Sequence, residues 1–415
     1  MATITGSTGS TITTINAGAN DQNGTATALA SAISNALLAS QSRLVQSGQP
    51  NTTGVPTYVE ITANNTVLGP AQVAAAINAA GPTTVVGSGS LFQQIIGNGS
   101  NITLAQRGGS GTIVLGDGNN RFDTSGAPTL GFNILTGAGN DTIFATQGNN
   151  TVAAGGGANV IGLSNGTNTV FLGGQDTVYG VVTGSGSETI VGGGVGTAAT
   201  VFTGNSSLYF IGGAGTATVA ASTGSATIFA GSGGGVFTGG TTGRNSLANS
   251  AGGASTLVGA ANNDTLYATG SGRTNLVAGI GNETLDGSTS TAANTFLGAS
   301  NGATLIGLGS GNNTVIAGSN SYIQAGRGGV QQLISQAGRT SGLVQVAGFN
   351  PSADKFSFQG YAGSTFTTGL VGAGSTGSVG QAVSIGGVAS TQVALGNGTT
   401  IQFIGVSNLQ GTSFN

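Results

Sequence analysis

The sequence contains no cysteine, histidine or tryptophan, and only 11 acidic and 8 basic side chains among its 415 residues. Without cysteine there is no disulfide and no thiolate nucleophile, and without histidine there is no general base that titrates near neutral pH. The tightest charged group is Glu283 and Asp286 with Arg273, whereas glycosidases need carboxylates that converge on one bond. The composition therefore predicts a protein that is not an enzyme.

Charge of either sign is scarce, at 5% of residues against about 25% in ordinary soluble domains. The few basic residues form no patch that could follow a phosphate backbone, which excludes nucleic acid as a partner. The sequence contains no run of about 18 apolar residues, so no membrane-spanning helix is expected. The N-terminus has no Sec-type signal pattern. A surface with so little charge is weakly protected against self-association, so we expect a homo-oligomer or filament.

Glycine is abundant, with 81 residues, and proline is rare, with 6. Hydrophobic residues reach 38%, which is too many for a disordered chain. From about residue 83, triplets such as TIV or TVF follow Gly/Asn turns and recur roughly every 9.5 residues, which is typical of a solenoid with two strands in a coil of about 19 residues. The middle residue of each triplet should point inward; examples are Ile143, Val170, Val178, Ile228, Leu257 and Val315.

The predicted fold class is all-β, a parallel β-solenoid with a small α-containing region before it and a β cap after it. The spacing of apolar residues predicts a helix within Thr25–Gln46, a strand within Thr57–Leu68 and a second helix from Pro70. Near the end of the chain, Gly396-Asn397-Gly398 lies between two alternating segments and predicts a hairpin. The predicted regions are an N-terminal capping or assembly region (1–82), the solenoid (83–337) and a C-terminal cap with a secretion signal (338–415).

One repeat, Gly137-Ala138-Gly139-Asn140-Asp141-Thr142-Ile143, combines turn glycines with a carboxylate. Glycine carbonyls and an Asp side chain supply the hard oxygen ligands that Ca²⁺ prefers. Acidic residues recur at the position of Asp141, but several repeats carry asparagine there, as at Asn150, Asn168 and Asn313. Two interpretations therefore stand: a few calcium sites, or coils held without ions by ladders of Asn and Thr side chains. The candidate metal ligands are Gly137, Gly139, Asp141, Asp176, Asp264 and Glu283.

A threonine precedes the inward residue of many triplets and should face outward. The set comprises Thr142, Thr151, Thr169, Thr177, Thr227, Thr265 and Thr314. This row is either an ordinary solvated strand face, which β-propensity explains, or a flat face that binds ice, a polysaccharide or a neighbouring copy.

The GxGNDxI repeat and two C-terminal segments resemble one protein family. The segments are GFNPSADKFSFQGY (348–361) and LGNGTTIQFIGVSNL (395–409). They are similar to RTX-like (hemolysin-type calcium-binding repeat) β-roll proteins exported by type I secretion. The resemblance implies an uncleaved C-terminal export signal, an extracellular or cell-surface location and folding on Ca²⁺. It places calcium first on Asp141 with Gly137 and Gly139, and then on Asp176, Asp264 and Glu283.

The chain departs from that family in its shortage of aspartate and in Asn397, where the family usually has Asp. Since the repeats themselves form most of the chain, we expect a secreted structural protein of a surface layer, filament or biofilm matrix. The alternative is an adhesin, or an ice- or polysaccharide-binding solenoid that uses the outward Thr face, with a cell-surface polysaccharide as its partner.

Overall fold

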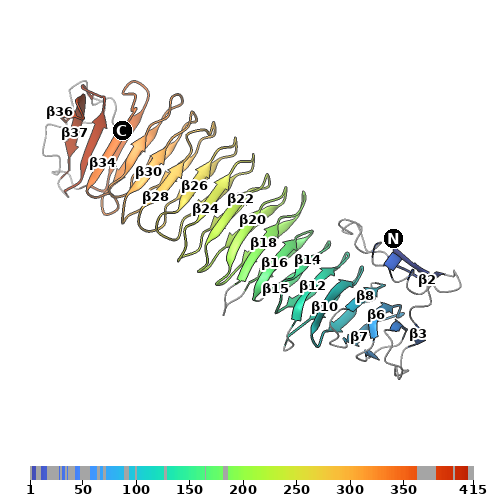
Figure 1. Ribbon diagram of the computed structural model, residues 1–415. Coiled ribbons are helices and arrows are strands. Elements are labelled where there is room, and N and C mark those ends of the chain that lie inside the picture. The colour runs from blue at the N-terminus through green and yellow to red at the C-terminus, as the bar shows by residue number, and fades with distance from the viewer. Residues whose placement is uncertain are drawn as a thin grey trace. The chain divides into compact units, whose positions relative to one another are not determined.

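The computed structural model describes residues 2–5, 11–15, 28, 30–32, 35, 43–46, 57–62, 66–68, 72–87, 93–98, 101–125, 129–163, 165–180, 186–361, 380–395 and 398–409. The chain divides into two compact units, Met1–Thr216 and Ala217–Asn415. Both are built from parallel β-coils (Figure 1), so the predicted all-β solenoid is confirmed. Among the described residues, no helix has the length and apolar character needed to cross a membrane.

In the coils of the first unit, successive strands lie in two sheets, and within each sheet a strand pairs in parallel with its equivalent in the neighbouring coil. Thr151 pairs with Thr169, and Thr142 with Val160, as a coil of roughly 19 residues requires. Sheet 1 of this unit contains β3 (Arg43–Gln46), β4 (Thr57–Ile61), β6 (Gln72–Ile77), β8 (Gln93–Gly97), β10 (Gly109–Val114), β12 (Thr129–Leu135), β14 (Thr151–Ala153), β16 (Gly166–Phe171), β18 (Gly186–Val191) and β20 (Ser207–Ile211). Sheet 2 contains β5 (Thr66–Val67), β7 (Thr83–Val86), β9 (Ile102–Ala105), β11 (Arg121–Asp123), β13 (Thr142–Ala145), β15 (Val160–Leu163), β17 (Gln175–Tyr179) and β19 (Ala198–Phe202).

The second unit has the same arrangement. Its sheet 1 contains β22 (Ala226–Ala230), β24 (Ser246–Asn249), β26 (Thr265–Ala268), β28 (Glu283–Asp286), β30 (Thr304–Gly307), β32 (Tyr322–Gln324) and β34 (Leu343–Ala347). Its sheet 2 contains β21 (Thr216–Ala220), β23 (Gly235–Thr238), β25 (Ser255–Val258), β27 (Thr274–Val277), β29 (Thr295–Leu297), β31 (Thr314–Ile316), β33 (Gln332–Gln336) and β35 (Lys355–Gln359).

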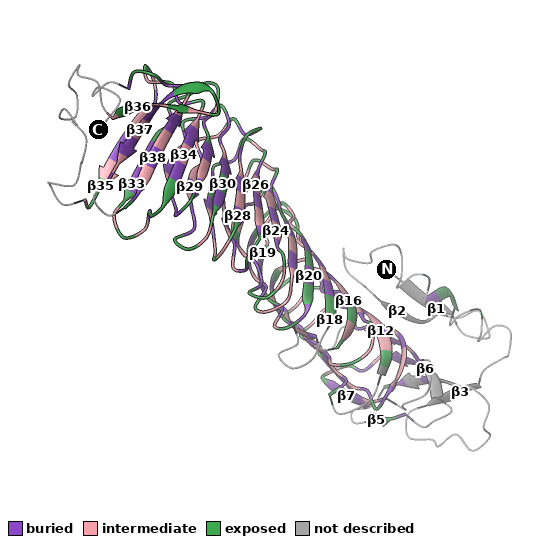
Figure 2. Ribbon diagram, turned by 60° about the vertical axis from the view of Figure 1, so that its left-hand side comes forward, coloured by how far each residue is buried: buried purple, intermediate pink, exposed green. Residues whose placement is uncertain are grey.

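Buried and half-buried residues alternate along most strands, so each sheet has an inner and an outer face (Figure 2). The middle residues of the triplets are inward as predicted, and each is fully buried: Ile143, Val170, Val178, Ile228, Leu257 and Val315. Each stacks on its equivalent in the neighbouring coil, for example Val152 on Val170. The core of each unit is therefore a narrow column of apolar side chains, extended by one layer per coil.

The N-terminal region differs from its prediction. Residues 28, 30–32 and 35 are helical and lie within the first predicted helix. The last four residues of that predicted segment, Arg43–Gln46, instead form strand β3. The second predicted helix is also wrong, because Gln72–Ile77 forms β6 between β4 and β8. Ala74, Ala75 and Ala76 are buried there, so packing between two strands overrides the helical propensity of alanine. Parallel coils consequently begin before residue 83.

The C-terminal motifs form a cap. β38 (Thr400–Ile404) pairs in parallel with β34. On its other side β38 pairs antiparallel with β37 (Val388–Ala394), which pairs antiparallel with β36 (Gln381–Ile385). The predicted hairpin is thus confirmed in its two strands, while Gly396 and Asn397 lie outside the described residues. Rings from the two motifs meet, since the Phe403 centroid lies 5.1 Å from that of Phe349 and 5.2 Å from that of Phe356. The two segments that carry the family resemblance therefore share one small core.

Short β1 (Ala2–Thr5) and β2 (Thr11–Ile15) pair antiparallel with each other. The outward threonines are half-buried, as expected for an outer face. They do not form one row, however. Thr151 and Thr169 lie on sheet 1 of the first unit, whereas Thr142 and Thr177 lie on sheet 2. Successive triplets alternate between the two sheets, which divides the predicted Thr face into two.

Candidate functional site

A buried polar side chain stands at the entrance to many strands, one residue before the outward position of the triplet. On sheet 2 of the first unit, the Oδ1 of Asn120 accepts from the backbone N–H of Ile102 at 3.0 Å. The Oδ1 of Asp141 accepts from the N–H of Asn120 at 2.7 Å, and the Oδ1 of Asn159 accepts from that of Asp141 at 2.8 Å. Each side chain thus pairs with the backbone of the preceding coil, and together they form a polar ladder.

The amide groups of the asparagines close the turns. The Nδ2 of Asn120 donates to the carbonyls of Gly116 and Gly118 at 3.0 and 2.9 Å. In the second unit, the Nδ2 of Asn313 donates to the Gly311 carbonyl at 2.9 Å and to the Oε1 of Gln331 at 2.9 Å. The carbonyls of these turns therefore receive N–H donors from the chain itself.

Two of the predicted carboxylate ligands accept main-chain donors from their own turns. The Oδ2 of Asp176 accepts from the N–H groups of Gly173 and Gly174 at 2.9 and 3.1 Å. The Oδ2 of Asp264 accepts from those of Ala260 and Ala261 at 2.8 and 2.9 Å. Burial raises the pKa of Asp176, and these hydrogen bonds oppose the rise. Each carboxylate caps its own turn, with N–H groups directed at the oxygens.

Asp141, with only 1% of its surface exposed, lies inside the coil. Burial raises its pKa to about 6, against the opposing hydrogen bond from Asn120. Gly137 and Gly139, in the same turn, allow neighbouring coils to pack closely. A Cβ on Gly137 would lie 2.3 Å from the Asp117 Oδ1, and a Cβ on Gly139, whose φ is +140°, would lie 2.3 Å from the Gly118 carbonyl oxygen. Both positions therefore require glycine whether or not an ion is present.

In the second unit the structure brings together two of the predicted ligands, Asp264 and Glu283, in adjacent coils. Both carboxyl groups are buried, and neither oxygen of Glu283 has a hydrogen-bond partner in the described part of the chain. Burial raises the pKa of Glu283 to about 8, with a further contribution from Asp264. With Arg244 they line a shallow hollow of about 380 Å³. Asp286 lies on the outer face of β28 and does not converge with Glu283.

Two of the four predicted carboxylates are already engaged by the main chain. Ca²⁺ takes 6–8 oxygen ligands, and at Asp176 and Asp264 a cation would have to displace N–H donors. Among the described residues, no group of three or more acidic side chains could hold a metal ion. Calcium binding at Gly137, Gly139, Asp141, Asp176, Asp264 and Glu283 stays a prediction.

A second candidate site lies on the outer face of sheet 2 in the first unit. The rings of Tyr179 and Phe202 stack there with centroids 6.1 Å apart and an interplanar angle of 17°. This pair is absent from the predictions made from the sequence. Its signal is the strand alternation itself, because each ring stands two residues after an outward threonine, Thr177 or Thr200.

The comparisons with known proteins supply no relative. No protein-family model, no curated protein and no solved structure matches the chain.

Proposed function

We propose that this protein is a secreted structural protein that assembles with copies of itself into an extracellular layer, filament or matrix. One observation carries the proposal: the outer strand faces are almost free of charge. On sheet 1 of the first unit, the central outward positions from β10 to β20 are all neutral. They are Thr112, Asn133, Thr151, Thr169, Thr189 and Tyr209.

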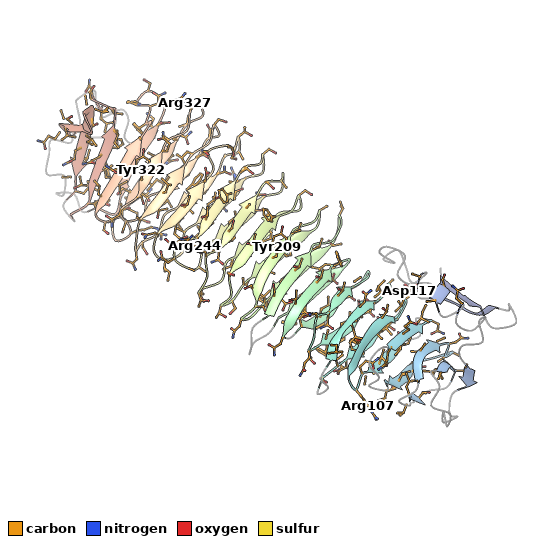
Figure 3. The ribbon with its side chains drawn as sticks, viewed as in Figure 1. Arg107, Asp117, Tyr209, Arg244, Tyr322 and Arg327 are labelled. Atoms are coloured by element: carbon orange, nitrogen blue, oxygen red, sulfur yellow. The ribbon has the colours of Figure 1, made fainter. Side chains whose placement is uncertain are left out.

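Half of the charged residues in the described part of the chain lie outside the strands, and three of those within strands, Asp176, Glu188 and Glu283, are buried. Arg107, Asp117, Arg244 and Arg327 lie outside the strands, whereas Tyr209 lies on β20 (Figure 3). Two charged residues that do reach a strand, Arg121 and Asp123, form a salt bridge with each other. Neutral, hydroxyl-rich strand faces offer little electrostatic repulsion to a second copy. Apolar groups such as Ile211, 38% exposed, add hydrophobic surface to the same face.

The secretion part of the proposal is supported by the resemblance of the C-terminal segments, which implies export by a type I system. The structure gives those segments a second role, because Phe349, Phe356 and Phe403 build the cap. A cap shields a terminal coil from non-specific edge pairing, so lateral contact through strand faces is the favoured mode of assembly.

Negative-stain microscopy of the purified full-length chain tests the proposal. We expect ordered assemblies from the wild type and monomers from a double variant, Thr169→Lys with Thr189→Lys, which places two charges on one outer face. Ser271→Lys adds a charge in a turn and is the matched control, which should still assemble. Persistent monodisperse monomers of the wild type would overturn the proposal.

A further inference from the structure

An exposed aromatic pair and a polar hollow lie at opposite ends of the same two strands, β17 and β19, on sheet 2 of the first unit. Tyr179 is 49% and Phe202 is 44% exposed. Large aromatic side chains are usually buried, so two stacked rings on a surface are informative. The Tyr179 hydroxyl makes no hydrogen bond within the described part of the chain, which leaves it available to a ligand.

The polar hollow, about 430 Å³ in volume, lies at the other end of the same strands. Its lining includes the side chains of Asn140, Gln175 and Thr197, together with turn glycines. The Gln175 amide is exposed and has no partner among the described residues. The Oδ1 of Asn140 accepts from the N–H of Ala158, and no residue in the described part of the chain accepts from its Nδ2. The hollow therefore offers unpaired amide donors and no charge.

The hollow and the rings belong to one continuous surface. Gln175, Thr177 and Tyr179 alternate outward along β17, so Gln175 and Tyr179 lie about 13 Å apart at 3.3 Å per residue. On β19 the outward positions Thr200 and Phe202 pair with Thr177 and Tyr179. This strip of two coils presents amides at one end, hydroxyls in the middle and aromatic faces at the other end.

We propose that this strip binds a neutral polysaccharide, with a short segment of the sugar chain lying along β17 and β19. Sugar rings present C–H groups on their faces, which pack on aromatic rings, and hydroxyls on their edges, which pair with amides and hydroxyls. Ligand sites of this kind combine apolar contact area with a few oriented polar groups. The strip contains no cation or anion among its outward and lining residues, so an uncharged polymer fits it better than an acidic one.

This site is separate from the face assigned to assembly, because it lies on sheet 2 whereas the Thr169 and Thr189 positions lie on sheet 1. Its failure and the failure of self-assembly can therefore be told apart. Charge substitutions at Thr169 and Thr189 should prevent assembly and leave polysaccharide binding intact.

Depletion assays with the full-length chain test the site, using insoluble cellulose and chitin as neutral probes and alginate beads as an acidic one. We expect the wild type to bind at least one neutral polymer and to bind alginate more weakly. Tyr179→Ala and Phe202→Ala should each weaken binding about tenfold, as truncation of a central contact residue does. Tyr267→Ala, an outward tyrosine on β26 of the second unit, is the matched control and should bind like the wild type. Circular dichroism confirms that each variant is folded.

Three outcomes would overturn the inference. The first is a wild type that binds neither neutral polymer. The second is unchanged binding by both aromatic variants while their fold is intact. The third is loss of self-assembly, and not of sugar binding, in the aromatic variants, which would make the strip a contact between copies of this chain.

Discussion

The side-chain Nδ2 of Asn150 lies 3.1 Å from the Oδ1 of Asn168, one coil further on, and the backbone N–H of Asn150 donates to the same oxygen, also at 3.1 Å. One buried asparagine thus ties two coils together through its side chain and its backbone. Such a ladder satisfies polar groups that the narrow apolar core cannot cover. It uses only groups of the chain itself.

Removing one step of the ladder should weaken the solenoid. Asn150 also donates to the carbonyls of Gln147 and Gly148, both at 3.1 Å, and accepts from the N–H of Phe132 at 2.9 Å. Asn150→Ala removes all of these hydrogen bonds. Unpaired buried polar groups cost about 1–3 kcal/mol, so urea unfolding should show a loss of that size. Asn275→Ala removes an exposed asparagine and should stay within about 0.5 kcal/mol of the wild type. Equal losses in both variants would contradict the ladder's role.

Adjacent glycines should respond differently to alanine. A Cβ at Gly155 would lie 1.8 Å from the Gly137 carbonyl oxygen, whereas a Cβ at Gly156 would meet nothing within 4 Å. We expect Gly155→Ala to lower the thermal midpoint strongly, because neighbouring coils must separate. Gly156→Ala should be neutral or slightly stabilising, since it restricts the unfolded chain. Scanning calorimetry would show the difference, and matching midpoints would refute the coil spacing described above.

The buried carboxyl of Glu283 predicts a pH dependence. Its folded-state pKa is raised from 4.5 to about 8, so between these values the unfolded chain binds fewer protons than the folded one. The contribution of Glu283 is then fully present below pH 4.5 and is lost as the pH rises through about 8. Asp264 faces Glu283 from the preceding coil, Thr304 lies in the following coil, and Arg244 lines the same hollow.

Glu283→Gln should flatten this part of the stability profile. Chemical unfolding at a series of pH values provides the measurement. Asp286→Asn, which changes an outward carboxyl of the same strand, should keep the wild-type slope. Since Glu188 is also buried, with its pKa raised to about 7, some slope should persist in Glu283→Gln. An unaltered slope in Glu283→Gln would show that this carboxyl is ionised in the folded protein.

The repeating part of the fold is readable from the sequence because its rules are local. A β-branched or aliphatic residue between two polar ones has only one side of a strand on which to be buried, and Ile143 and Val178 accordingly lie inside. The recurrence of asparagine before the triplets likewise predicts stacked side chains, which Asn150 and Asn168 show.

Other features depend on contacts with other strands, turns or coils, which the local sequence does not specify. Ala74–Ile77 has helical character, and only its position between β4 and β8 makes it a strand. The orientation of the Asp176 carboxylate depends on two N–H groups of its own turn. In a turn of different backbone conformation, the same N–H groups would point in other directions. The contact of Tyr179 with Phe202 requires the register of two coils.

Thermal unfolding followed by circular dichroism, in excess calcium and then in excess chelator, tests the central claim most directly: that protein groups, and not ions, hold the coils together. We predict the same spectrum and the same midpoint in both conditions. A ligand that binds only the folded state at 100 times its Kd adds about 2.7 kcal/mol, a shift that such melts resolve. A solenoid that unfolds in chelator and is restored by calcium would contradict the account.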